Sequence, residues 1–307
     1  MSMQKFYSNG KLLLSGEYLI LDGAAGIGLP TVLGQEMLVS NSNLEGVLSW
    51  ESLDESGDCW FEGSYSLPDL KLIRFKGQQK VADTLQSILM EAKKTNPNFL
   101  IGNQGIHVTT KLEFPSDWGL GSSSTLINNI AQWSEINAFE LLFSSFGGSG
   151  YDIACAQIDQ PIIYELNEGS PEFESVHFNP AFKDQLYFVH LNKKQVSSEG
   201  IKAYKRKKVN QDTIQDISNL SNSLLSVTSL DAFNEIIKKH ESIVGGLLGI
   251  EPVQQRLFPD FLGQIKSLGA WGGDFILASG DTSTKAYFNK KGFQTVIPYA
   301  SMIKQNE

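Results

Sequence analysis

The sequence predicts a mixed α+β fold, and three observations carry this prediction. The first half of the chain is rich in segments with the alternation or the apolar character of strands. Three segments with apolar residues at helical spacing follow one another between residues 197 and 248. The order of elements lacks the strict strand–helix alternation of a parallel α/β protein. At 307 residues, the chain is long enough for one large domain or two packed ones.

The elements up to residue 112 follow from local patterns. Residues 11–21 are apolar enough for a buried strand, and residues 79–94 have the apolar spacing of a helix that packs against a core. Residues 70–75 fit either a short strand or the lead into that helix. Three further segments are expected to be strands: 36–42, 46–50 and 106–112.

From residue 125 onward, helical patterns predominate. Helices are expected over 125–131, 135–146, 197–207, 213–227 and 231–248. Strands are expected over 161–165, 174–178, 185–191, 275–279 and 285–288.

The most informative local feature is the run Gly119-Leu120-Gly121-Ser122-Ser123-Ser124, which leads into an apolar-periodic helix. Glycines let backbone N–H groups approach an oxyanion, and a helix N-terminus adds unpaired donors and a positive dipole end. No lysine follows the second glycine, so this is not the Walker pattern. Two interpretations are open at this stage: a turn with a serine-capped helix, or a site for phosphate and hydrated Mg²⁺.

Composition and charge exclude several classes of partner. A formal net charge of −9 argues against a nucleic-acid partner. The one basic cluster, residues 202–208, is either a solvated helix face or a rim that attracts an anionic ligand. The sequence has no apolar run long enough to span a membrane and no secretory signal, so no membrane partner is expected. Cys59 and Cys155 lack metal or redox spacing, which predicts a reduced, cytoplasmic protein. A monomer or a homodimer is expected.

Three other segments complete a pattern with the glycine loop. They are residues 8–23, Gly147-Gly148-Ser149-Gly150-Tyr151-Asp152-Ile153-Ala154, and residues 266–276. In this order the four segments resemble the signature motifs of the GHMP kinases, which include galactokinase, homoserine kinase, mevalonate kinase and phosphomevalonate kinase. The resemblance implies an N-terminal phosphate-loop domain of a type shared with a ribosomal protein, over residues 1–175. It also implies a ferredoxin-like C-terminal domain over residues 176–307, with a cleft between the two.

The resemblance also implies roles for individual residues. The loop residues Gly119, Leu120, Gly121, Ser122, Ser123 and Ser124 would bind the phosphates of ATP, and Ser123 would reach Mg²⁺. Asp152 matches the catalytic carboxylate, which takes or orients the proton of the acceptor. Lys11 matches the lysine that pairs with this carboxylate and with the incoming oxygen. A lysine there keeps the carboxylate ionised and offsets charge on the transferring phosphoryl group.

Two departures from the family pattern concern the metal and the third motif. The glutamate that completes the Mg²⁺ site in mevalonate kinases falls on Leu141 here, with Glu140 one residue away. A shift of one helical residue turns a side chain by about 100°, so Glu140 is a candidate ligand at an offset position. In the third motif, Trp271 replaces a glycine beside Gly272 and Gly273, so the backbone differs locally or a ring lines the cleft. Because this motif shapes the substrate end of the cleft in the family, the resemblance assigns Gly272 and Gly273 to the substrate.

The acceptor side is assigned from further resemblances. Tyr18, which follows Glu17, stands where mevalonate kinases and galactokinases usually have histidine, and both residues are assigned to the substrate. Lys193, Lys194, Ser197 and Ser198 are similar to segments that contact a phosphorylated acceptor. These features indicate phosphomevalonate or mevalonate as an anionic small-molecule acceptor. The run Gly-Tyr-Asp-Ile-Ala also resembles a bacterial GHMP subgroup named for those letters. A non-catalytic ligand-binding homologue and a diphosphomevalonate decarboxylase-like enzyme remain alternatives.

Overall fold

A computed structural model describes residues 3–193, 197–269, 271 and 273–304, without the side chains of residues 197–199 and 203. The chain divides into two compact units, which we describe one at a time. Unit 1 consists of residues 1–10, 33–116 and 121–157, and unit 2 consists of residues 11–32, 117–120 and 158–307. The domain boundary at residues 175 and 176 stays a prediction.

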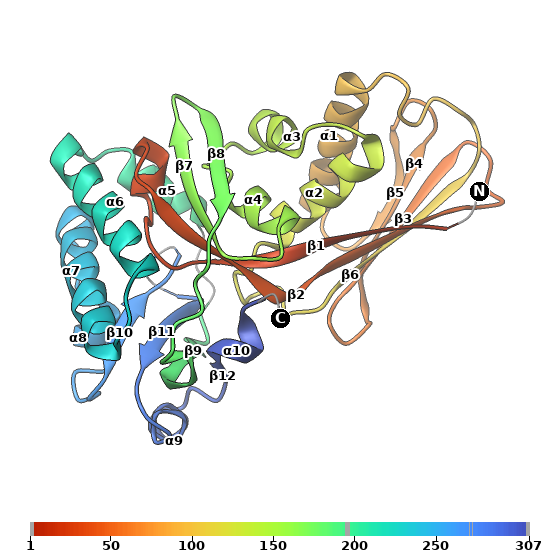
Figure 1. The fold of residues 1–307 in the computed structure, drawn as a ribbon. Helices are drawn as coiled ribbons and strands as arrows, with labels where there is room; N and C mark the ends of the chain where they lie inside the picture. The colour runs from red at the N-terminus through yellow and green to blue at the C-terminus, as the bar shows by residue number, and fades with distance from the viewer. Residues whose placement is uncertain (1–2, 194–196, 270, 272, 305–307) are drawn as a thin grey trace. The chain divides into compact units, whose positions relative to one another are not determined.

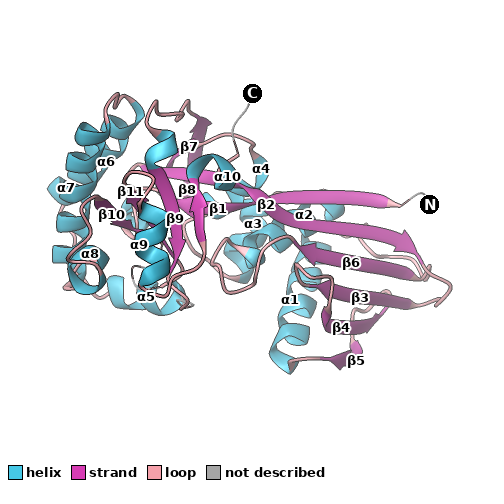
Figure 2. Cartoon of the chain, turned by 90° about the horizontal axis from the view of Figure 1, so that it is seen from below, coloured by secondary structure: helices cyan, strands magenta, loops and turns pink. Residues whose placement is uncertain are grey.

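Unit 1 contains a five-membered run of strands in the order β5-β4-β3-β6-β2 (Figure 2). The pairing of β3 with β6 is parallel, and the other pairings in this run are antiparallel. Strand β1 also pairs with β2. The strands are β1 (Gln4–Leu13), β2 (Gly26–Asn41), β3 (Val47–Leu53), β4 (Cys59–Ser66), β5 (Leu72–Lys76) and β6 (Ile106–Leu112).

The helices of unit 1 cover one face of these strands (Figure 1). They are α1 (Gln79–Thr95), α2 (Ser122–Ser134), α3 (Ala138–Ser145) and α4 (Tyr151–Gln157). The apolar stripe of α1, from Ala82 to Ala92, packs on the same core as Met37, Trp50 and Val108 of the sheet. This packing places the N-terminus of α2, which follows the glycine loop, and the N-terminus of α4, which carries Asp152, within one unit.

Unit 2 is built on a four-stranded antiparallel sheet in the order β10-β11-β9-β12. Its strands are β9 (Leu186–His190), β10 (Gln264–Ser267), β11 (Phe275–Ser279) and β12 (Val296–Pro298). A hairpin of β7 (Ile162–Asn167) and β8 (Ser170–Ser175) pairs with the first residues of β2, which lie in this unit. The helical elements are η1 (Leu19–Asp22), η2 (Lys183–Gln185), α5 (Ser197–Tyr204), α6 (Gln211–Leu225), α7 (Leu230–Leu248), α8 (Val253–Leu257), α9 (Thr284–Lys290) and α10 (Tyr299–Met302).

The α+β class is confirmed, and so are most of the expected elements. Two expectations were wrong, and the strand expected over 174–178 is displaced, because β8 ends at Ser175. Residues 285–288, expected as a strand, lie in α9, where Thr284 and Phe288 are buried one helical turn apart. The strand expected over 11–21 ends at Leu13 and is followed by η1, because Gly16 and Tyr18 have positive φ angles of 93° and 61°, which interrupt extended backbone.

Two further findings concern the cysteines and the helix lengths. Cys59 and Cys155 are both free thiols. Over the described part of the chain, none of the helices combines the length and the apolar character that crossing a bilayer requires.

Candidate active site

The glycine loop has the backbone conformation that its sequence requires. Gly119 and Gly121 have φ angles of 66° and 87°, in the left-handed region that only glycine occupies readily. A Cβ atom on Gly119 would also lie 2.5 Å from a carboxylate oxygen of Asp274. Position 119 therefore requires glycine for two reasons: its backbone is in the left-handed region, and Asp274 lies too close to leave room for a side chain.

The loop delivers the chain into α2 with its first N–H groups unclaimed by a capping side chain. Gly121 is the N-cap of α2 and has no side chain to accept their hydrogen bonds. Ser122 is half-buried and Ser123 is exposed, whereas Ser124 is buried. N–H groups at a helix start, together with the helix dipole, favour an anion. The start of α2 therefore has the chemistry of a phosphate site, with the Ser123 hydroxyl on its open side.

Asp152, on another element of unit 1, contacts Ser124, the last residue of the glycine loop. It stands in the first turn of α4, after Gly147, Gly148 and Gly150, which all have positive φ angles. The Ser124 hydroxyl donates a short hydrogen bond to the Asp152 carboxylate. This bond leaves the second carboxylate oxygen for another partner and orients the side chain at the start of α2.

Lys11 contacts the first residues of the loop. Its backbone N–H donates to the carbonyl of Leu120 at 3.0 Å. Its Nζ donates to the carbonyl of Gly119 at 2.8 Å. Lys11 is therefore held against the first two residues of the loop within unit 2.

A buried amide network, which the sequence did not reveal, holds α2 in place. Asn128 and Asn129 project from α2, and both bond to Ser8 of β1. The Asn129 amide also donates to the carbonyl of Gln35 in β2, and Thr125 donates to the side chain of Gln35. All five residues are at most 5% exposed. Two adjacent asparagines inside an apolar helix were the signal in the sequence, because buried amides need such partners.

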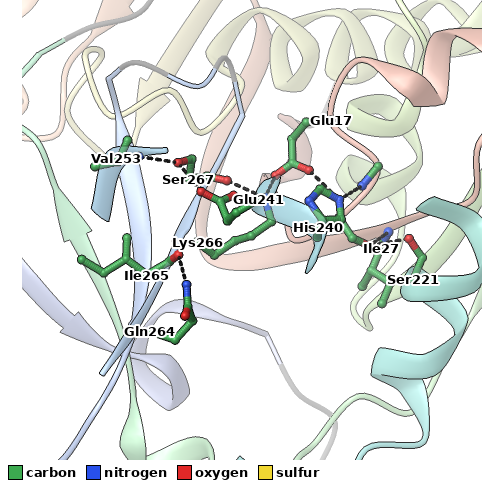
Figure 3. A network of polar contacts seen from close by, with 12 residues as sticks. Glu17, Ile27, Ser221, His240, Glu241, Val253, Gln264, Ile265, Lys266 and Ser267 are labelled. Carbon is green, nitrogen blue, oxygen red and sulfur yellow. Dashed lines mark hydrogen bonds and ion pairs between the residues drawn. The ribbon is translucent and has the colours of Figure 1, made fainter. Parts of the chain in front are cut away.

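Glu17, expected to contact the acceptor, is instead fully buried in a charged cluster (Figure 3). Its Oε1 is paired with Lys266, and its Oε2 lies 3.2 Å from Nε2 of His240. Lys266 also lies 3.2 Å from Glu241, which accepts a hydrogen bond from Ser267 at 2.7 Å. This carboxylate is closed to a ligand from solvent, so its geometry supports a structural role.

Charge balance in this cluster requires a proton. The N–H of Gly16 donates to Nε2 of His240, so this nitrogen carries a lone pair and the ring is neutral. Burial raises the pKa of Glu17 to about 7, although Lys266 opposes the shift. Burial lowers the pKa of His240, and Lys266 lowers it further. A proton on Glu17 leaves one carboxylate, Glu241, for the one ammonium group.

The other residues assigned to the acceptor lie in unit 2. Tyr18 is buried, with 8% of its surface exposed, and its ring stacks on the ring of Tyr204. Lys193 is exposed, and its carbonyl accepts a hydrogen bond from the N–H of Asp274 at 2.6 Å. Gly273 is buried. Lys194, Gly272 and the side chains of Ser197 and Ser198 lie outside the described residues.

Trp271, the departure in the third motif, is a core residue of unit 2. Its side chain is 2% exposed and packs in one apolar cluster with Tyr18, Tyr204 and Val244. The backbone at Trp271 takes a φ of 59°, which a glycine would adopt without strain. The bulky ring is therefore absorbed by local packing in unit 2.

The residues present suit Mg²⁺ held mainly by phosphate and water. Glu140 is exposed on α3, where its backbone N–H donates to the side chain of Asn137, the N-cap. No group of three or more His, Cys, Asp or Glu side chains in the described residues is arranged to hold a metal. The hydroxyl of Ser123 and the carboxylate of Asp152 are hard oxygen donors at the loop. Mg²⁺ commonly takes only one or two protein oxygens beside substrate phosphates, so this donor set fits it.

Comparison with solved structures identifies the fold. A mevalonate kinase from Methanococcus jannaschii superposes with a TM-score of 0.70 at 13% identity, covering 99% of each chain. A Streptococcus pneumoniae phosphomevalonate kinase in complex with phosphomevalonate and AMPPNP superposes with a TM-score of 0.69 at 17% identity. The match covers 96% of this chain and 99% of the other. A Lactococcus lactis galactokinase complexed with galactose superposes with a TM-score of 0.64 at 14% identity, and the match covers 94% of this chain and 88% of the galactokinase.

By sequence, the chain matches no protein-family model and no curated protein. The structural matches are nevertheless nearly complete over both chains, and all three neighbours are members of the superfamily whose motifs the sequence resembles. The chain therefore has the fold of the GHMP kinases.

Proposed function

We propose that this protein is an ATP- and Mg²⁺-dependent small-molecule kinase. One observation carries the proposal: the loop that starts α2 joins a phosphate-type helix N-terminus to the Asp152 carboxylate through Ser124. A phosphate site alone would fit many binding proteins. A carboxylate held at the same loop supplies a group that can take or orient the proton of an acceptor.

Different residues of the loop contact the phosphates of the donor nucleotide and its Mg²⁺ ion. Backbone N–H groups at the start of α2 hold phosphate oxygens, and the half-buried Ser122 lies in the first turn beside them. Ser123 supplies a hydroxyl ligand for Mg²⁺. When bound, Mg²⁺ offsets the charge on the phosphates. Lys11, which contacts Gly119 and Leu120, adds a positive charge beside the loop and keeps its carbonyls in place.

Asp152 acts on the acceptor. Its hydrogen bond from Ser124 selects one orientation of the carboxylate, which leaves the other oxygen for the acceptor. With an alcohol acceptor, the carboxylate takes the hydroxyl proton as the oxygen attacks phosphorus. With a phosphate acceptor, which is already ionised, orientation of the incoming oxygen is sufficient.

The acceptor is an anionic small molecule, with phosphomevalonate first and mevalonate second. Lys193 and the basic cluster at residues 202–208 are exposed cations in the segments assigned to the acceptor. Similar structures include a phosphomevalonate kinase in complex with phosphomevalonate and AMPPNP and a mevalonate kinase in complex with R-mevalonate. Cations on segments of this kind favour phosphate or carboxylate groups in the acceptor.

An ADP-release assay with phosphomevalonate, mevalonate, homoserine and galactose tests the proposal. We expect turnover that requires Mg²⁺ and is fastest with phosphomevalonate. Release of CO₂ with diphosphomevalonate would instead indicate the decarboxylase. Nucleotide binding without turnover of any acceptor would indicate a ligand-binding protein.

A further inference from the structure

Two stacked tyrosines in unit 2 connect η1 to helix α5. The rings of Tyr18 and Tyr204 have centroids 5.5 Å apart, and their planes are inclined by 25°. Their exposed fractions are 8% and 2%, so the contact is closed to water. Offset stacking at this separation is favourable beyond the burial of the two rings. Helix α5 cannot shift along the segment before η1 without opening this contact.

A hydrogen bond connects the C-terminal end of η1 to Tyr204. The hydroxyl of Tyr204 donates a short hydrogen bond to the carboxylate of Asp22, the last residue of η1. Burial raises the pKa of Tyr204, and the Asp22 carboxylate raises it further, so the phenol stays a donor. Tyr204 therefore contacts both the residue before η1 and the residue that ends it.

Gly200 completes the arrangement from the backbone of α5. A Cβ atom at position 200 would overlap the hydroxyl oxygen of Tyr18 and lie 3.0 Å from its Cζ and 3.1 Å from its Cε1. The requirement for glycine here is steric, because no positive φ is needed at this helical position. Tyr18 itself has φ 61° and ψ −45°, a conformation that costs free energy in a residue with a side chain. The packed contacts around its ring offset this strain.

We propose that Tyr18 is a positioning residue for the acceptor. Tyr18, Asp22, Gly200 and Tyr204, called here the tyrosine clamp, hold α5 against η1. Helix α5 follows Lys193 and runs into the basic cluster at residues 202–208, whose cations are exposed. The clamp keeps these cations at one position so that they meet an anionic acceptor without first being ordered. The inference rests on the proposed function, and it explains why tyrosine follows Glu17 in this chain.

The test compares four proteins: wild type, Gly200→Ala, Tyr18→Phe with Gly200→Ala, and Gly246→Ala. Alanine at 200 adds a methyl group that the Tyr18 hydroxyl blocks, although alanine otherwise favours a helix. Phenylalanine at 18 removes this oxygen and leaves contacts that need to yield by only a few tenths of an ångström. Gly246 is the matched control, because a Cβ on this α7 glycine meets nothing within 4 Å.

Two readouts separate the clamp from its function. Hydrogen exchange of the peptide that spans α5 reports the clamp without any turnover. We expect faster exchange in Gly200→Ala, recovery in the double variant, and no change in Gly246→Ala. In the kinase assay we expect the acceptor KM of Gly200→Ala to rise at least tenfold, with the ATP KM within twofold of wild type. The double variant should recover most of the acceptor KM.

Each other result overturns a defined part of the inference. Unchanged exchange in Gly200→Ala shows that the clamp does not hold α5. Faster exchange with an unchanged acceptor KM shows a structural clamp and refutes the positioning role. If the double variant stays as impaired as Gly200→Ala, contact with the Tyr18 hydroxyl is not the cause. If wild type phosphorylates no acceptor, the proposed function and the positioning role both fail, while exchange still decides whether the clamp exists.

Discussion

Stability should decrease as the pH rises from about 4.5 to 7, because Glu17 is buried in a cluster that favours its protonated form. Its pKa rises from 4.5 to about 7 on folding. Between these values the folded state binds more protons than the unfolded state, so each added pH unit favours unfolding. The contribution is complete below 4.5 and is lost as the pH passes through about 7. A shift of this size corresponds to about 3 kcal/mol, at roughly 1.4 kcal/mol per pKa unit.

The perturbation that isolates this contribution is Glu17→Gln. Glutamine keeps the shape of the protonated side chain and cannot ionise. Other groups titrate in the same range: burial raises the pKa of Glu241 and lowers that of His240, and the two act in opposite directions on the pH dependence. When the free energy of unfolding of Glu17→Gln is subtracted from that of wild type at each pH, the contributions of Glu241 and His240 cancel to first order.

The assay is urea unfolding of both proteins at several pH values between 4.5 and 8. We expect the stability of wild type relative to Glu17→Gln to fall by about 3 kcal/mol across this range, with most of the change complete by pH 7. A relative stability that is flat, or that rises with pH, would show that Glu17 is ionised throughout in the folded protein. The proton assigned to Glu17 would then be wrong.

Three further predictions concern the loop and the acceptor. Gly121→Val should abolish the increase in Tm that ATP with Mg²⁺ gives wild type, because a side chain at φ 87° strains the backbone and blocks its approach to phosphate. An undiminished increase in Tm would show that the nucleotide binds elsewhere. Ser124→Ala should lower kcat about tenfold or more with an unchanged ATP KM, because the Asp152 carboxylate loses its orienting hydrogen bond; wild-type kcat would show that the bond is dispensable. Lys193→Ala with Lys194→Ala should raise the acceptor KM about 10- to 150-fold, as expected for lost charge-assisted contacts to phosphate. An unchanged acceptor KM, or a preference for an uncharged sugar, would contradict the anionic acceptor.

The sequence predicted the fold class because its motifs and periodic segments are local. The strands at 106–112 and 275–279 have the expected bounds, and the helix expected over 79–94 extends by one residue as α1. Patterns of four residues were less informative. Residues 285–288 alternate over too short a span to distinguish a strand from one turn of a helix.

The parts of the site that the sequence did not predict depend on contacts across long separations. Glu17 lies in the same sequence motif as Lys11, yet its partners are Lys266 and His240, more than two hundred residues away. A motif shows that a carboxylate is needed at this position but not whether the fold turns it toward a ligand or into the core. Gln35 supports α2 in the same way, through a carbonyl and an amide that carry no sequence signature. The assignment of Asp152 rests on a local feature, the glycines before it, and its role stays a prediction.

The most direct test of the account is the turnover of Asp152→Asn in the ADP-release assay, with ATP affinity measured in parallel. Asparagine keeps the shape of the carboxylate at the end of the loop but cannot accept a proton. With an alcohol acceptor, the account predicts that kcat falls by about 10²- to 10⁴-fold while ATP affinity hardly changes. With a phosphate acceptor, a smaller loss is expected, because orientation is then the main contribution. Turnover within about threefold of wild type on an alcohol acceptor would contradict a central role for this carboxylate.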